Sequence, residues 1–79
     1  MTRDEIYAKL TEIFKENLDL DEIELTDTTT ADDVEGWDSL AHIGLIAAIE
    51  QEFGFRLAMK EVVNLHNVGE MVDRILQKI

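Results

Sequence analysis

A serine at the start of a helical pattern is the residue in this chain with the clearest capacity for chemistry. Ser39 follows Asp38, and an apolar helical pattern begins at Leu40. Aspartate is a good N-cap because its carboxylate accepts the unpaired N–H groups of the first turn, so we expect Ser39 at the first helical position. A hydroxyl there points at the positive end of the helix dipole, where free N–H groups would stabilise a phosphate. The stretch therefore indicates a phosphoester on Ser39.

The same stretch holds the residue types of a hydrolase triad. Ser39 and His42 are three residues apart on one helix face, close enough to touch. However, the Gly-x-Ser-x-Gly elbow would need glycine where Leu40 stands, Asp38 is committed to capping, and so short a chain offers no evident oxyanion hole or substrate cleft. We therefore expect no enzyme, and interpret His42 as a half-exposed helix residue packed on Trp37.

Residues 38–54 resemble the prosthetic-group site of acyl carrier proteins. Asp38-Ser39-Leu40 stands near the middle of 79 residues and is followed by an apolar helix that closes with Glu-x-x-Phe-Gly at residues 50–54. In that family a separate transferase moves 4′-phosphopantetheine from coenzyme A onto the serine, and the thiol of this arm carries an acyl group as a thioester. The resemblance thus implies 4′-phosphopantetheine as the cofactor, Ser39 as its covalent attachment site, and Asp38 and Leu40 as flanking binding residues.

The resemblance also implies partners, namely a phosphopantetheinyl transferase and acyl-processing enzymes with basic docking patches. It leaves the pathway open among fatty acid, polyketide and more specialised acyl synthesis. Peptidyl and D-alanyl carrier proteins share the serine motif but usually lack this acidity, and they remain an alternative. A non-enzymatic acidic adaptor that binds a basic protein is the alternative from another class. If a carried chain is buried between helices, its candidate lining residues are Ile46, Ile49, Leu57, Val62 and Leu65.

Charge is distributed unevenly along the chain. The net charge is −11, and no lysine or arginine lies between Lys15 and Arg56, where most of the acids fall. Nucleic acid and anionic membrane surfaces are excluded as partners because both require a cationic protein surface. A basic protein partner fits this one-sided charge better than solubility alone.

Composition predicts one small all-α domain over residues 1–79. Hydrophobic residues make up 46% of the chain, aromatic residues only 6%, and proline is absent. No cysteine is present for a disulfide or thiolate metal site. The acidic start Asp19-Leu20-Asp21 fails as a calcium loop because Glu24 replaces the required glycine, so we expect no metal site. The charged N-terminus and the lack of a membrane-length apolar run favour a cytoplasmic protein, which we expect to be monomeric.

Apolar periodicity predicts a small four-helix bundle with a long first loop and a short third helix. We expect helices from a Thr2–Glu5 capping box to residue 18, from 39 to 53 with Gly54 as C-cap, from 59 to about 65, and from a second capping box at 67–70 onward. The connection 19–37 has no periodicity, and Leu20, Ile23 and Leu25 are its expected apolar anchors. In the last two helices the predicted inward-facing residues are Val62, Val63, Leu65, Val68, Met71, Val72, Ile75, Leu76 and Ile79.

Gly44 is unusual inside the second helix, where glycine costs about 1 kcal/mol relative to alanine. A close backbone contact or a functional surface would explain it. Many fatty-acid carriers have acids at the positions of Ala41 and Gly44, so by resemblance the middle of the docking face is nearly neutral. We expect a dedicated partner, contacted over Leu40, Gly44 and Ala48 and steered by the acids Asp32, Asp33 and Glu35.

Overall fold

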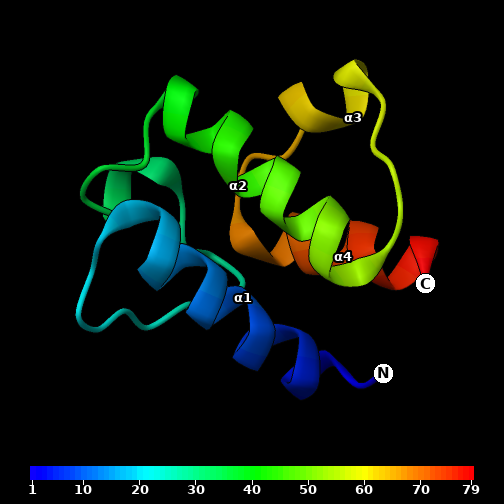
Figure 1. The fold of residues 1–79 in the computed structure, drawn as a ribbon, viewed down its shortest axis with the longest axis horizontal. Coiled ribbons are helices and arrows are strands. Elements are labelled where there is room, and N and C mark those ends of the chain that lie inside the picture. Colours follow the sequence, from blue (N-terminus) through cyan, green and yellow to red (C-terminus); the bar gives the residue numbers. More distant parts are fainter.

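Four α-helices pack around one apolar core in the computed structural model, which describes residues 1–79 (Figure 1). The elements are α1 (Arg3–Leu18), the short 3₁₀ turn η1 (Ala31–Asp33), α2 (Ser39–Phe53), α3 (Met59–Val63) and α4 (Val68–Lys78). The predicted all-α fold, with its long first loop and short third helix, is confirmed. Only η1, inside the long loop, was not predicted.

Local hydrogen bonds set the helix ends. The Thr2 hydroxyl accepts the Glu5 N–H at 3.2 Å while the Glu5 carboxylate accepts the Thr2 N–H at 2.9 Å, which confirms the first capping box. Gly54 ends α2 in the left-handed conformation, with φ 75°, as predicted. At α4 only half of the predicted capping box forms: the Asn67 side chain accepts the Glu70 N–H at 2.8 Å, and no bond returns from the Glu70 carboxylate.

The core lies between α1, α2 and α4, and α3 contributes no fully buried residue. Val62 and Val63 were both predicted to face inward, yet Val63 is 63% exposed, and α3 ends there instead of at about residue 65. Neighbouring residues on a helix point about 100° apart, so a helix of little more than one turn can bury only one of them. Leu76 and Ile79 were also expected inside, but both are exposed at the end of α4, where no element covers them.

The long loop is anchored to the core by five apolar side chains. Leu20, Ile23 and Leu25 are partly buried against the core, as predicted. Val34 and Trp37 are buried more deeply and were not predicted as anchors. These side chains explain how a connection of this length stays ordered without regular structure of its own.

Backbone hydrogen bonds join the loop to the start of α4. The N–H of Val68 donates to the Thr29 carbonyl at 2.9 Å, and that of Gly69 donates to the Asp27 carbonyl at 3.0 Å. Free N–H groups of a helix start need such partners. The contact is so close that a Cβ on Gly69 would lie 2.7 Å from the Asp27 oxygen.

A polar cluster closes the same region. The Arg3 guanidinium pairs with Asp27 at 2.8 Å and with Asp73 at 2.7 Å, and the Tyr7 hydroxyl donates to Asp27. The Tyr7 hydroxyl and Arg3 hold the pKa of Asp27 below its usual value, while burial and the Asp27 carboxylate raise the pKa of Tyr7 to about 12. The cluster thus ties α1, the loop and α4 together through side chains as well as backbone.

A second carboxylate, that of Glu61, ties α3 to α4. It accepts the Ala58 N–H at 3.0 Å and contacts Lys78 at 3.2 Å and Arg74 at 3.4 Å. The Ala58 N–H and Lys78 are the main causes that hold the pKa of Glu61 below its ordinary value. Since α3 has almost no core of its own, we infer that this carboxylate sets its position.

Two glycines of opposite role give a matched stability test. Gly69→Ala should lower the free energy of unfolding by roughly 1–3 kcal/mol, because its Cβ collides with the Asp27 backbone. Gly44→Ala should raise it by about 0.5–1 kcal/mol, because the nearest atom to its Cβ, Asn17 Oδ1, is 3.8 Å away. Urea denaturation measures both, and a Gly69→Ala chain as stable as the unaltered one would contradict the close loop contact.

Stability should depend on acid through Glu61. Because its pKa is lowered in the folded chain, the carboxylate stabilises the fold fully above its ordinary pKa of 4.5 and loses this contribution as pH falls through the lower folded value. Glu61→Gln should therefore lower the melting temperature at pH 7 and flatten its decline at acid pH. Glu16→Gln, on the exposed side of α1, is the control. Parallel pH profiles for the Glu61→Gln and unaltered chains would rule out this role.

Candidate functional site

Ser39 is the first residue of α2 and is exposed to solvent. Asp38 is the N-cap, in extended conformation, and its Oδ1 accepts the Ala41 N–H at 2.8 Å. The Asp38 carbonyl accepts the His42 N–H at 2.8 Å, which begins the helical ladder. This is the arrangement that the sequence predicted, with the serine directly inside a capped helix start.

The surroundings of Ser39 fit a phosphate ester. Its hydroxyl makes no hydrogen bond within the chain, and neither the Ser39 N–H nor the Leu40 N–H has a partner there. Two free donors at a helix start, together with the helix dipole, favour an anion attached to the serine oxygen. A phosphate would therefore find donors already in place, and its addition would displace no existing bond.

His42 is bonded through both ring nitrogens, which excludes the hydrolase triad. The Trp37 Nε1–H donates to Nδ1 of His42 at 3.1 Å, so Nδ1 carries no proton, and Nε2–H donates to the Val62 carbonyl at 3.2 Å. Neither nitrogen remains free to take a proton from Ser39. The expected packing on Trp37 is confirmed, with the two rings stacked at 6.0 Å. The bond to Val62 joins α2 to α3 and was not predicted.

Trp37 holds the end of the loop in place. The indole is 6% exposed, and its ring meets Phe14 of α1 edge-on at a centroid distance of 5.0 Å. Its backbone N–H donates to the Val34 carbonyl at 3.2 Å, and the left-handed Gly36 between them, with φ 85°, allows the turn. A lone tryptophan immediately before the Asp-Ser-Leu motif was a sequence signal for this anchor.

A groove begins at Ser39 and runs between the first turns of α2 and α3. Its volume is about 710 Å³, and it is lined mainly by apolar side chains. Of the five residues predicted to line a cargo site, only Val62 and Leu65 line this groove, while Ile46 and Ile49 lie in the core. Leu57 is not part of the groove either. Five apolar lining residues were not predicted: Ala31, Trp37, Ile43, Met59 and Val63.

Large apolar side chains are exposed around the same groove. Leu40 is 80% exposed and Ile43 63% exposed on α2, and Met59 is 75% exposed on α3. With Val63 they form what we call the apolar docking surface. Ala48, which was expected in the contact face, instead packs partly against the core beside α1. The exposed face of α2 therefore includes the side of the helix that carries Ile43 and borders α3, whereas Ala48 lies on the side that borders α1.

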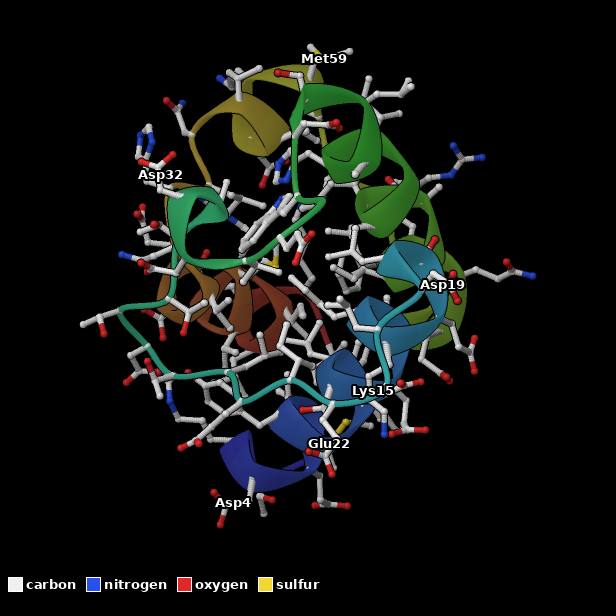
Figure 2. The ribbon with its side chains drawn as sticks, turned by 90° about the vertical axis from the view of Figure 1, so that its left-hand side faces the viewer. Asp4, Lys15, Asp19, Glu22, Asp32 and Met59 are labelled. Atoms are coloured by element: carbon white, nitrogen blue, oxygen red, sulfur yellow. The ribbon has the colours of Figure 1, made fainter.

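The charges near the site are acidic. Asp32 lines the groove, and in Figure 2 it lies on the same half of the molecule as Met59, with Asp4 at the opposite end. None of the ion pairs involves an acid between residues 28 and 38. No group of histidine, aspartate and glutamate side chains is arranged to hold a metal ion. None of the helices has the length and apolar character needed to cross a membrane.

Comparison with known proteins agrees with this geometry. The family model described as a phosphopantetheine attachment site matches residues 8–75. The acyl carrier protein of Petrotoga mobilis is 35% identical over 100% of this chain and 93% of its own length, and that of Thermotoga maritima is 32% identical over 99% and 96%. The solution structure of a holo acyl carrier protein from Geobacter metallireducens is similar with a TM-score of 0.84 and 39% identity, covering 91% of this chain and 83% of that one.

One assignment follows from three findings: the exposed serine at a capped helix start, the apolar groove beside it, and the similarity to the family model over residues 8–75. The chain belongs to the acyl carrier protein family, the carriers built on a phosphopantetheine attachment site.

Proposed function

We propose that Ser39 bears the 4′-phosphopantetheine group of this acyl carrier protein. The chain is a carrier and not itself an enzyme, and its prosthetic group is 4′-phosphopantetheine. When bound, that group supplies a thiol that holds an acyl chain as a thioester. The observation that supports Ser39 is its unbonded hydroxyl at the capped start of α2, beside two free N–H groups.

Each residue of the motif has a separate task in this proposal. The Ser39 oxygen acts as the nucleophile when the transferase delivers the group from coenzyme A. Asp38 holds the first turn of α2, so the serine keeps its position on the surface. Leu40, which projects into solvent, provides apolar contact area for the transferase.

The proposal extends to partners and setting. A phosphopantetheinyl transferase and acyl-processing enzymes with basic patches would approach the acidic end of the molecule that holds Asp32, Glu35 and Ser39. We propose that the chain acts as a single domain of residues 1–79, as a monomer and in the cytoplasm. Fatty acid, polyketide and specialised acyl synthesis all fit this site.

The attachment site can be tested by mass. Ser39→Ala should fold normally, since alanine is an excellent helix former, but should gain no phosphopantetheine when treated with a transferase and coenzyme A. Thr28→Ala removes another exposed hydroxyl and should load like the unaltered chain. Asp38→Ala should load poorly and lose about 0.5–2 kcal/mol of stability with its cap. Intact mass spectrometry reads the loading, and a fully loaded Ser39→Ala chain would refute the assignment.

The structure gives the dedicated-partner hypothesis a sharper form. Gly44 is exposed on α2 and has room for a side chain, so its lack of charge is a property of the surface and not of packing. Next to it, the apolar docking surface offers contact area without charge. Among the loop acids, Asp33 is occupied by accepting the Thr30 N–H at 3.0 Å, whereas Asp32 and Glu35 form no side-chain hydrogen bond or ion pair and are free to steer a basic partner.

Salt separates steering from contact. Gly44→Glu should weaken binding of the native acyl-processing partner at both low and high salt, and Gly44→Ala is its uncharged control. The double variant Asp32→Asn with Glu35→Gln should slow association at low salt only, because the Debye length falls from about 10 Å at 0.1 M to about 3 Å at 1 M. Stopped-flow binding measures both. An unchanged affinity for Gly44→Glu would remove the case for a dedicated partner.

A further inference from the structure

The groove that begins at Ser39 has a hydrogen-bonded floor. Trp37 at the end of the loop, His42 on α2 and Val62 on α3 all line the groove. They are joined in series, Trp37 Nε1 to His42 Nδ1 at 3.1 Å and His42 Nε2 to the Val62 carbonyl at 3.2 Å. One imidazole thus links the loop to two helices across the base of the groove.

The bundle core lies beyond this floor. Ile46 is one turn further along α2 than His42, on the same face of the helix, and Ile49 follows on α2. Both are buried, and neither lines the groove, whereas the exposed Ile43 does. His42 is therefore placed at the boundary between an open apolar groove and a closed apolar core.

An acyl chain that passed from the groove into the core would have to separate these hydrogen-bonded groups and leave them without partners. The indole N–H of Trp37 and the carbonyl of Val62 would each lose the imidazole to which they are bonded. A donor or acceptor left unpaired away from water loses the full energy of its desolvation, and no side-chain nitrogen or oxygen is buried without a partner in this chain. An apolar chain lying in the groove gains contact area without that loss.

We propose that His42 determines the cargo by acting as a latch, keeping the acyl chain in the open groove between α2 and α3 and out of the core. This rests on the proposed function, in which the arm starts at Ser39. The cargo class that follows is short or polar acyl groups, because a long apolar chain would stay partly in water in this groove. The groove itself combines apolar Ile43 and Met59 with polar Asp32, which suits such groups.

The latch can be tested on the unmodified chain, independently of any arm. Titration with 1-octanol, followed by methyl NMR of the isoleucines, should shift Ile43 but not Ile46 or Ile49. In His42→Ala, the signals of Ile46 and Ile49 should shift as well. His42→Gln, whose amide can accept from the indole and donate to the carbonyl, should restore the unaltered pattern. His66→Ala removes an exposed imidazole of the same groove that forms no hydrogen bond and should also leave the pattern unaltered.

Two results of this titration would overturn the proposal. Shifts of Ile46 and Ile49 in the unaltered chain as large as those in His42→Ala would show that no latch exists. An unaltered pattern in a folded His42→Ala chain would show that the imidazole does not close the core. Circular dichroism establishes that each variant is folded at the temperature of the titration.

Loading with acyl groups extends the test to the cargo. In the unaltered chain the dodecanoyl form should melt only slightly above the butyryl form, because most of its added length stays in water, whereas in His42→Ala this margin should be larger because the chain enters the core. A dodecanoyl form of the unaltered chain that melts higher than its butyryl form by the same margin would overturn the latch. If Ser39 takes up no arm at all, the proposed function fails, and the 1-octanol titration still decides whether His42 closes the core.

Discussion

Trp37 packs edge-on against Phe14 of α1 and donates its indole N–H to His42 of α2, so a single side chain joins the end of the long loop to two helices. The residue that follows it, Asp38, caps α2, and the next is Ser39. The position of the serine relative to the core therefore depends on the burial of this indole. Because the indole ring packs against Phe14 and its N–H is bonded to His42, the end of the loop has one fixed position, and the start of α2 is held at the surface.

The other half of the loop is fixed by a different kind of contact. Backbone carbonyls at Asp27 and Thr29 accept the first N–H groups of α4, an approach that requires glycine at position 69. The Arg3 guanidinium then bridges Asp27 to Asp73 on α4. The loop is thus held by α4 at its middle and by α1 and α2 at its end, which accounts for its order despite its length.

Charge follows the same division between scaffold and site. Most of the ion pairs lie on exposed or half-exposed side chains, where such pairs contribute about 0–1 kcal/mol each, and Glu61, whose side chain is 16% exposed, is the exception. Asp32 and Glu35, near the approach to Ser39, form no ion pair, and the adjoining surface of α2 and α3 exposes the large apolar side chains of Leu40, Ile43 and Met59. In the proposed function, long-range attraction and close contact with a partner would therefore come from separate neighbouring parts of the surface.

Much of this could be predicted from sequence, because helix caps and apolar periodicity are local. The bounds of α2, the capping by Asp38 and the left-handed Gly54 all depend on residues within a turn of one another. The match to residues 8–75 shows that the family resemblance was sound. The role of Ser39 itself remains a prediction.

Contacts between distant segments had no such local signal. Three features were decided only by the packing of the helices, because each depends on a partner far away in the chain. They are the choice between Val62 and Val63 as the inward residue, the close approach of the Asp27 carbonyl to Gly69, and the bridging of two elements by the His42 ring.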